Sequence, residues 1–382
     1  HIPTYLSTQH HENICVFFWK NRCFQFRNLP FGLSPAPYIF SLTVSQVAKF
    51  FHLHSILANF YLDDWFFFLV CKLILMANQP KILKVTRMLG WIVNEEKSDL
   101  DISQHKVYIG GDFDLSNGTV RPTNKRWEKI QATIPVFQKL SQAKASLWAS
   151  TLGLLTSTQE LTPMGRLHLR SLQFHLNKFW LDREDTKVLI PVTAQCREAL
   201  SWWLVFDNVM AGVPLQLPPA DLTLFTDSSS TGYGASLNDM HFAGKWSEDQ
   251  AKHHINYLEM LCVKLALEYF LQHVAGKVVL VASDNVSVVS YINKSSGTHS
   301  ITLHELTFSM LSWCFQNHIL LRARHIAGKL NQIADGLSRD GRVIQTEWSL
   351  HPSIFKSICQ TWCTPQIDLF ATSQNKQCPV YY

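Results

Sequence analysis

Four stretches of sequence decide the fold of this chain: LTLFTDSS at 222–229, NYLE at 256–259, VVLVASDN at 278–285 and HIAGKLNQIAD at 325–335. Each of them places one carboxylate at an informative point of a predicted element. Asp227 ends a short strand, Glu259 lies one turn into a long helix, and Asp284 ends an apolar strand. Asp335 lies in the last helix. Ends of adjacent strands gather at one edge of an α/β sheet, so we expect these side chains to converge there.

The region around these stretches predicts an α/β domain of about 120 residues, which is a normal domain size. Short apolar runs predict strands and longer amphipathic runs predict helices. The predicted strands are 222–226, 234–237, 241–246, 278–283 and 319–324, and the predicted helices are 255–274, 286–293, 301–317 and 331–338. The preceding LPPA at 217–220 predicts a linker, because two prolines disfavour a regular element.

A cluster of four carboxylates is the ligand set that hard cations prefer, and it suits Mg²⁺ or Mn²⁺. Two ions in one site can activate a water molecule and stabilise the leaving oxygen of a phosphodiester. His325, ten residues before Asp335, is a candidate for carrying a proton. The alternative for any single Asp is that it only caps a helix, but four acids at the appropriate element ends favour a metal-dependent hydrolase.

These stretches resemble the motifs of type 1 ribonuclease H in their order and their element placement. The resemblance implies that Asp227, Glu259, Asp284 and Asp335 ligate two metal ions and that His325 assists. It also implies cleavage of RNA within an RNA–DNA hybrid. Only a short loop at 293–300 separates the two middle helices, so we expect the basic handle of some cellular members to be absent.

The first 120 residues predict a mixed α/β unit that contains a second acidic site. Apolar runs at 15–19 and 23–26 predict one hairpin, and LPFGLSPAP at 29–37 leads into a predicted helix over 38–50. YLDD at 61–64 lies between two apolar runs and predicts a hairpin with Asp63 and Asp64 at its tip. A solvated acidic turn without function is the alternative for this tetrapeptide.

YLDD is similar to the catalytic turn of reverse transcriptases, and it is accompanied by LPFGLSPAP, LGW at 89–91, NEEKS at 94–98 and YIGG at 108–111. The resemblance implies that Asp63 and Asp64 hold Mg²⁺ against a dNTP, and that RNA template and DNA primer are bound. The residues expected to contact nucleic acid or nucleotide are Pro30, Phe31, Gly32, Gly110 and Gly111. The family also needs an Asp on a preceding strand, which we expect to lie before His1, so we predict no polymerase activity for residues 1–382.

Residues 121–218 change character and predict a helical connector, with prolines at 122, 163 and 191 as breaks. The stretch 121–180 has nine Lys and Arg against two Glu, a net charge of +7, whereas 221–340 has nine against eleven, or −2. A basic segment beside an acidic domain is typical of a protein that handles a polyanion. We therefore expect Lys125, Arg126 and Lys129 to contact nucleic acid.

Composition limits the remaining possibilities. With 382 residues, 47% hydrophobic and 16% charged, the chain predicts two or three folded domains and little disorder. The longest apolar run, 65–77, contains Lys72 and is too short to span a membrane. Nine scattered cysteines predict free thiols in a reducing compartment, hence the cytoplasm or nucleus. Cys359, Cys363 and Cys378 leave zinc binding as a less favoured alternative, because a fourth ligand is missing.

The full set of motifs is similar to that of retroelement polyproteins, most of all the DIRS type, through LGLL at 152–155, PMGRLHLR at 163–170 and IDLFAT at 367–372. The missing initiator Met predicts a fragment. We expect a partial reverse-transcriptase palm over 1–120, a thumb or connection over 121–218, a ribonuclease H domain over 219–340 and an unassigned tail over 341–382. Long-terminal-repeat elements and plant pararetroviruses share the palm and ribonuclease H motifs and are alternatives to the DIRS type. Two alternatives for the function are a decayed or domesticated copy that binds nucleic acid without catalysis and, less favoured, a cellular hybrid-specific nuclease.

Overall fold

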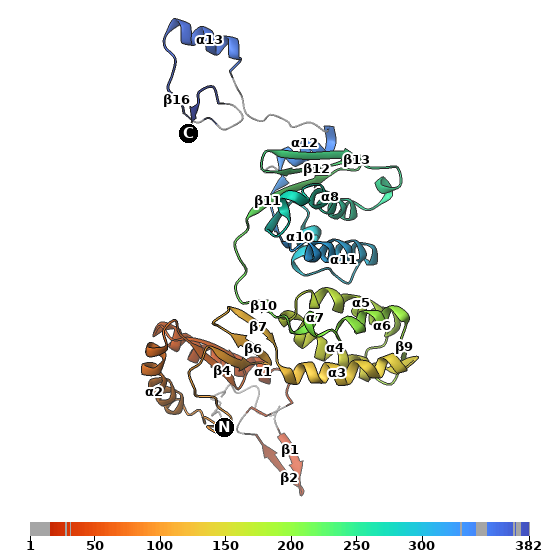
Figure 1. Cartoon of the computed structure of the whole chain (residues 1–382). Coiled ribbons are helices and arrows are strands. Elements are labelled where there is room, and N and C mark those ends of the chain that lie inside the picture. Colours follow the sequence, from red (N-terminus) through yellow and green to blue (C-terminus); the bar gives the residue numbers. More distant parts are fainter. Residues whose placement is uncertain are drawn as a thin grey trace. The chain divides into compact units, whose positions relative to one another are not determined.

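The computed structural model describes residues 16–26, 29–30, 32–328, 331–340, 350–369, 371 and 376–381 (Figure 1). The chain forms two compact units. The first comprises residues 1–136, 160–163 and 203–216, and the second comprises 137–159, 164–202 and 217–382. The connector region thus contributes to both units, and the functional boundaries at 120, 218 and 340 stay predictions.

The first unit begins with the two predicted hairpins and the helix between them. Its elements are β1 (Val16–Trp19), β2 (Arg22–Gln25), α1 (Ala36–Leu53), β3 (Leu57–Tyr61), β4 (Asp64–Phe68) and α2 (Lys72–Met88). The prediction of both hairpins is confirmed, since β1 pairs with β2 and β3 with β4 in antiparallel register. The helix α1 extends beyond the predicted 38–50 at both ends, and at its start Pro35 is the N-cap and Pro37 lies in the first turn, where proline is tolerated.

A four-stranded antiparallel sheet completes the first unit. It contains β5 (His105–Tyr108), β6 (Gly111–Asp114), β7 (Thr119–Pro122) and β10 (Val213–Pro214), in the order β10-β7-β6-β5. Phe66 of β4 stacks on Tyr108, with ring centroids 5.0 Å apart, and lies 6.1 Å from the ring of Phe113. These aromatic contacts pack the hairpin that carries Asp63 and Asp64 against the sheet.

The connector, residues 121–218, is mostly helical, as predicted, but besides β10 it contains two more short strands, and the sequence analysis predicted none of the three. Its helices are α3 (Asn124–Lys139), α4 (Ala145–Thr158), the 3₁₀ turn η1 (Gln159–Leu161), α5 (Gly165–Phe179), α6 (Ala194–Trp202) and α7 (Phe206–Met210). The strands β8 (Gln142–Lys144) and β9 (Leu189–Pro191) pair with each other. Residues 188–190 are apolar and end at a proline, so they fit a short strand better than a helix.

The second unit contains a five-stranded sheet in the order β13-β12-β11-β14-β15. The strands are β11 (Leu222–Ser228), β12 (Gly232–Leu237), β13 (Met240–Lys245), β14 (Val278–Ser283) and β15 (Leu320–His325). The first three are antiparallel neighbours, whereas β14 runs parallel to both β11 and β15. The helices are α8 (Ile255–Tyr269), α9 (Leu271–Val274), α10 (Val286–Asn293), α11 (Ile301–Gln316) and α12 (Gln332–Asp340).

One predicted helix of this unit is divided. The single helix expected over 255–274 is wrong in this detail, because α8 ends at Tyr269 and α9 begins at Leu271. Phe270, between them, has φ −89° and ψ 17°, and its ring is buried in the core, which turns the chain there. The order of elements otherwise agrees with the prediction.

The core of the second unit lies between the sheet and the helices α8, α10 and α11, whereas α12 covers the opposite side of the sheet (Figure 1). The same core includes Leu167 of α5, and Met164 packs against it. Ser171 of α5 also makes a hydrogen bond of 3.2 Å with His304 of α11. The connector helix α5 is therefore part of the hydrophobic core of the second unit.

The helix α12 packs closely on the sheet because β12 carries glycines there. A Cβ at Gly234 would lie 2.5 Å from the main-chain oxygen of Ala334, and a Cβ at Gly232 would lie 2.8 Å from that of Ser338. The C-terminal segment adds α13 (Pro352–Thr361) and the parallel pair β16 (Ile367–Asp368) and β17 (Val380–Tyr381). None of the described helices combines the length and apolar character needed to cross a membrane.

Candidate active site

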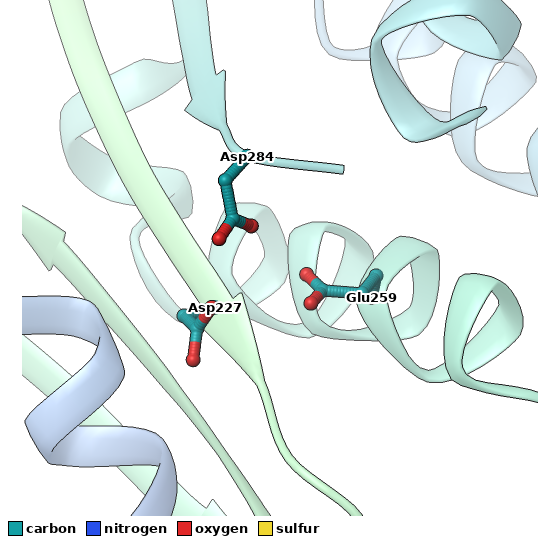
Figure 2. Close-up of side chains that lie close together, drawn as sticks. All are labelled: Asp227, Glu259 and Asp284. Carbon is teal, nitrogen blue, oxygen red and sulfur yellow. The ribbon is translucent and has the colours of Figure 1, made fainter. Parts of the chain in front are cut away.

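Three of the four predicted nuclease ligands meet at one edge of the five-stranded sheet (Figure 2). Asp227, Glu259 and Asp284 each offer a carboxylate oxygen, and these oxygens lie within 4.8 Å of one another. Asp227 and Glu259 are buried, at 7% and 4% exposure, whereas Asp284 is partly exposed. Within the described part of the chain, this is the one group of three or more acidic, His or Cys ligands that could hold a metal ion.

Parallel pairing of β11 with β14 brings two of these acids together. Leu222 pairs with Val279 and Phe225 with Ala282, so both strands end at the same edge and present Asp227 and Asp284 there. Glu259 comes from the second turn of α8, whose first turn is capped by the His254 ring, which accepts a hydrogen bond from the amide of Asn256. The thiol of Cys262, one turn further, lies 3.3 Å from the main-chain oxygen of Asp227 and can donate to it.

Burial raises the pKa values of two carboxyls in this cluster. It raises the pKa of Glu259 to about 9, and the neighbouring Asp227 and Asp284 contribute to this rise. It also raises the pKa of Asp227 to about 6, and a hydrogen bond from Ser338 opposes this rise. Glu259 Oε2 is buried and has no hydrogen-bond partner within the described chain. The three charges therefore destabilise one another unless protons or a cation neutralise them.

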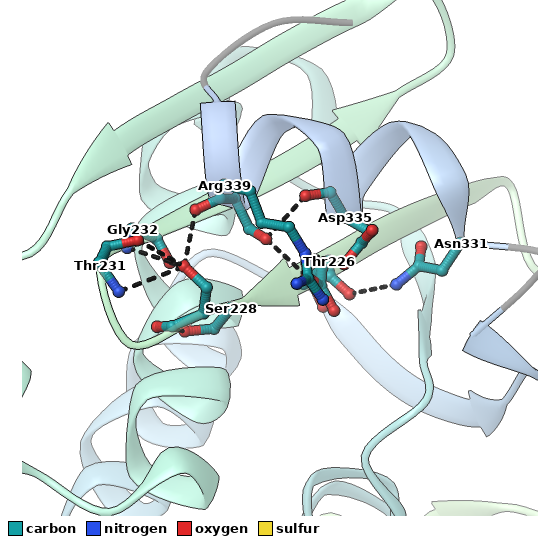
Figure 3. Close-up of polar contacts among 10 residues, drawn as sticks. Thr226, Ser228, Thr231, Gly232, Asn331, Asp335 and Arg339 are labelled. Carbon is teal, nitrogen blue, oxygen red and sulfur yellow. Dashed lines mark hydrogen bonds and ion pairs between the residues drawn. The ribbon is translucent and has the colours of Figure 1, made fainter. Parts of the chain in front are cut away.

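Asp335 lies on α12 and does not belong to the group of three acids. Figure 3 shows it beside Arg339. Its Oδ1 accepts a hydrogen bond from Arg339 Nε at 2.7 Å. Its negative charge contributes to the raised pKa of Asp227. The helix is held to β11 by Asn331, which donates to the main-chain oxygen of Thr226 at 2.8 Å. The structure thus brings three of the four predicted ligands together and places the fourth beside them.

His325 ends β15 at the same edge of the sheet. Its Nε2 lies 3.1 Å from the main-chain oxygen of Asp284, and its side chain is exposed. Gly328 follows closely, since a Cβ there would lie 3.0 Å from Asp284 Oδ2. The next two residues of the predicted motif, Lys329 and Leu330, lie outside the described residues.

The second predicted acidic site is an exposed turn. Asp63 and Asp64 are both exposed, and Leu62 before them adopts a left-handed conformation with φ 48°. The indole of Trp65 donates to the main-chain oxygen of Leu62 at 3.1 Å. The hydroxyl of Tyr108 donates to the main-chain oxygen of Asp64 at 3.2 Å. Within the described residues, neither acid belongs to a group of three ligands.

The predicted nucleic-acid contacts fall into different environments. Gly32 has φ 91° and is exposed, Pro30 is half-buried, and Phe31 lies outside the described residues. Gly111 is buried, and Gly110 has φ 74° in the turn between β5 and β6.

The three basic residues of α3 also differ from one another. Lys125 and Lys129 are exposed, but the Arg126 guanidinium lies against Gly110 and donates to the main-chain oxygen of Ile109 at 3.0 Å. Burial lowers the pKa of Arg126. Arg126 therefore supports the β5–β6 turn, in addition to any contact with phosphate.

The cysteine-based alternative has no support among the described residues. Cys378 is buried, Cys359 is partly buried and Cys363 is exposed, and the three do not form a group of metal ligands. All the cysteines that the structure describes are free thiols, as the sequence predicted.

Sequence analysis missed Ser338, whose hydroxyl donates to Asp227 Oδ2 at 2.7 Å. One signal was present: Ser338 follows Asp335 by three residues, so both lie on one face of a helix. It also missed the thiol of Cys262, which lies one turn after Glu259 on α8. The contact of the Tyr108 hydroxyl with the main chain of Asp64 was not predicted either, although Tyr108 belongs to the YIGG motif at 108–111.

No family model matches the chain, and no curated protein matches it. Solved structures of similar fold include the foamy viral protease-reverse transcriptase with an RNA/DNA hybrid, at 16% identity and TM-score 0.47, covering 91% of this chain and 45% of that one. The same viral protein with double-stranded DNA gives 17% identity and TM-score 0.43, covering 83% and 54%. Ribonuclease H1 of Halobacterium salinarum NRC-1 gives 14% identity and TM-score 0.27, covering 32% and 98%.

The chain therefore spans about half the length of the first two viral structures. The predicted fold class, mixed α/β with a ribonuclease H-like domain, is confirmed by the arrangement of the elements. Because the TM-scores are below 0.5, these likenesses say nothing about chemistry. The chemistry follows instead from the residues of the site.

Proposed function

We propose that this chain is part of a retroelement polyprotein whose ribonuclease H-like domain hydrolyses the RNA strand of an RNA–DNA hybrid. The observation that carries the proposal is the convergence of Asp227, Glu259 and Asp284 from three different elements to within 4.8 Å. Buried acids placed this closely oppose folding, and such clusters concentrate at functional sites. The motif resemblance supplies the substrate class, and the DIRS type is the retroelement that we infer from the same motifs.

The residues present fit a divalent cation. All the ligand atoms are carboxylate oxygens, which suit Mg²⁺ or Mn²⁺ rather than a soft metal. The buried Glu259 Oε2 lacks a hydrogen-bond partner within the described residues, and a cation would satisfy it. Asp227, Glu259 and Asp284 would hold one ion, and Asp335, which lies beside them, would help to hold a second. Bound ions of this kind supply an activated water and stabilise the leaving oxygen of a phosphodiester.

The chain's own residues would orient the reaction and exchange protons. His325 donates through Nε2 to the main-chain oxygen of Asp284, which leaves Nδ1 as the ring atom that takes up or releases a proton. The short stretch from His325 to Gly328 keeps the ring beside the carboxylates. The β11 and β14 strands fix Asp227 and Asp284 in register, so little reorganisation is needed when substrate binds.

We infer a reverse-transcriptase origin for the first unit from its motifs, and within its described residues the two acids of the turn have no third acidic ligand. Asp63 and Asp64 would hold Mg²⁺ for a dNTP, with RNA template and DNA primer as the partners. Two exposed carboxylates are a smaller ligand set than two-metal chemistry uses, and neither belongs to a group of three within the described residues. We infer that residues 1–382 act as a nuclease and not as a polymerase.

Substrate selectivity tests the proposed function. The whole chain is incubated with four labelled duplexes of one sequence: RNA–DNA, DNA–DNA, RNA–RNA and a hybrid with a single ribonucleotide. We expect Mn²⁺-dependent cleavage of the RNA strand of the full hybrid, and none in excess chelator. Equal cleavage of DNA–DNA, or cleavage that persists in chelator, would contradict the proposal.

A further inference from the structure

Ser338 lies at the junction between α12 and the acidic cluster. Its hydroxyl donates to Asp227 Oδ2 at 2.7 Å and lies 2.9 Å from the main-chain oxygen of Asp335. Its side chain is almost completely buried, with 1% exposure. One hydroxyl on α12 therefore contacts a carboxylate of β11 and the backbone of the residue that carries the fourth acid.

The position of this hydroxyl is fixed by its surroundings. The main-chain oxygen of Ser338 accepts a hydrogen bond from Ser229 Oγ at 2.8 Å, in the loop that follows β11. A Cβ at Gly234 would lie only 2.7 Å from the amide nitrogen of Ser338, so the helix sits directly on the sheet. Asn331 attaches the start of the same helix to Thr226, next to Asp227 (Figure 3). The helix is thus held at Asn331, just before its first residue, and at Ser338 itself.

A serine hydroxyl has one hydrogen but two acceptors here. Serine in a helix often donates back to a carbonyl oxygen in the preceding turn, which would be Asp335 here. When Asp227 is ionised, its oxygen is the stronger acceptor, because hydrogen bonds to charged groups are stronger than those to neutral ones. The hydroxyl then holds the plane of the Asp227 carboxylate in one orientation.

We propose that Ser338 is a positioning residue of the metal site, which orients the Asp227 carboxylate toward Glu259 and Asp284 and sets the distance of α12, with Asp335, from that cluster. This inference rests on the proposed function and deepens it. Ser338 touches neither substrate nor metal, and it acts through Asp227. Partners that orient a metal-ligating side chain contribute to affinity, and their loss costs about 10- to 100-fold in metal binding.

The test compares three variants of the full chain. Ser338→Ala removes the hydroxyl, and Ser338→Cys keeps the size of the side chain with a weaker donor. Ser236→Ala is the matched control, because Ser236 is a buried serine of β12 whose hydroxyl donates to the main-chain oxygen of Asn238. The measurement is the Mn²⁺ affinity of the site that disappears in Asp284→Asn, determined by calorimetry together with the melting temperature of each variant.

We expect Mn²⁺ affinity to fall by about 10- to 100-fold in Ser338→Ala and by less in Ser338→Cys, with no more than about a two-fold change in Ser236→Ala. Affinity for the hybrid in chelator should be equal in all of them, because Ser338 does not contact the substrate. A folded Ser338→Ala with Mn²⁺ affinity within about two-fold of the original chain would overturn the proposal. If Ser338→Ala does not fold, a Ser338→Cys variant with undiminished affinity overturns it in the same way.

Failure of the proposed function gives a different result. If the original chain has no Mn²⁺ site that depends on Asp284, the proposed metal centre is wrong and Ser338 has nothing to position. If that site exists and the Ser338 variants bind Mn²⁺ normally, the centre stands and only the role of Ser338 is refuted.

Discussion

The two acidic sites of this chain are built in opposite ways. Asp63 and Asp64 are adjacent in sequence, lie at the tip of a two-stranded hairpin and are exposed. Asp227, Glu259 and Asp284 are 32 and 25 residues apart in succession (259 − 227 and 284 − 259), come from three elements, and include two buried side chains. The hairpin site is made by local sequence, whereas the buried site exists only when the sheet and α8 are assembled.

We expect burial to give the two sites different affinities for a cation. The exposed turn is well solvated, so its charges cost little free energy and we expect it to hold a cation weakly by itself. The buried cluster opposes ionisation and gains most from a cation. We therefore expect metal-dependent activity at the buried cluster and not at the turn.

The strongest contrast that we expect is between two activities of the same chain. Residues 1–382 should cleave the RNA of a hybrid with Mn²⁺ and should not extend a primer on an RNA template with dNTPs. The measurement is a gel assay of both reactions in one buffer, with an active reverse transcriptase as the positive control. Template-directed incorporation by this chain would show that the exposed pair finds another ligand and that the contrast is wrong.

A matched pair of substitutions separates the two sites. Asp284→Asn should lower hybrid cleavage by at least about 10³-fold, because loss of a metal ligand removes several kcal/mol of stabilisation of the transition state. Asp63→Asn makes the same chemical change in the exposed turn and should leave cleavage unchanged. Cleavage rates under single-turnover conditions decide the matter, and similar losses in both variants would refute the separation of the two sites.

His325→Ala should slow cleavage by about 10²-fold or more without abolishing it, because proton transfer by a positioned side chain is worth about 10²–10⁴-fold. Mn²⁺ affinity should be retained, since His325 contacts the main chain of Asp284 and not its carboxylate. His299→Ala is a control for the removal of a histidine, in the loop before α11. Loss of the Mn²⁺ site in His325→Ala would show that this ring is a ligand.

The buried cluster should make the stability of the chain depend on pH. Glu259 and Asp227 have pKa values of about 9 and about 6, above their ordinary values of 4.5 and 3.8, so the folded chain holds these protons more tightly than the unfolded chain does. Their contribution to stability is complete at pH values below the ordinary pKa values. It is lost as the pH rises through the folded-state pKa values, which are about 6 for Asp227 and about 9 for Glu259.

Glu259→Gln should remove most of this dependence. Without divalent cations, its melting temperature at about pH 8 should exceed that of the original chain, by roughly 2–4 °C for each kcal/mol of repulsion removed. Glu305→Gln, at an exposed position of α11, is the matched control and should behave as the original chain. Mn²⁺ should stabilise the original chain more at about pH 8 than at about pH 6, and should not stabilise Glu259→Gln to the same extent.

The weakest effect that we expect concerns hybrid binding by α3. Lys125→Gln with Lys129→Gln should weaken hybrid binding and lower the slope of log affinity against log salt by roughly 0.9 for each phosphate that is no longer neutralised. Arg126 is retained, because it supports the β5–β6 turn. Lys81→Gln with Lys84→Gln, exposed on α2, is the matched control. An equal slope in the two double variants would rule out a special role for α3.

This last experiment needs the whole chain. Leu167 of α5 lies in the core of the second unit, and Ser171 is hydrogen-bonded to His304. A fragment that begins at Ala220 would expose that part of the core, so its hybrid affinity would report on folding as well as on the missing lysines.

Local sequence patterns were enough to predict the elements and the residue types of both sites. Alternating and periodic apolar residues predicted the strands and helices of 222–338 in their order, because side chains alternate on a strand and repeat every 3.6 residues on a helix. Placing Asp227 and Asp284 at strand ends needed no more than that pattern. The turn at 61–64 was also predictable, since two apolar runs flank it directly.

Packing between distant segments determines which of these residues meet. It places three carboxylates within 4.8 Å of one another, and it brings α12 with Asp335 close to the sheet where two glycines of β12 leave room for the helix. It joins Ser338 to Asp227 across 111 residues. It also turns Arg126 to the β5–β6 turn and places Leu167 in a core far from it in sequence. Local periodicity carries no information about such contacts, because it reports only which face of its own element a side chain occupies.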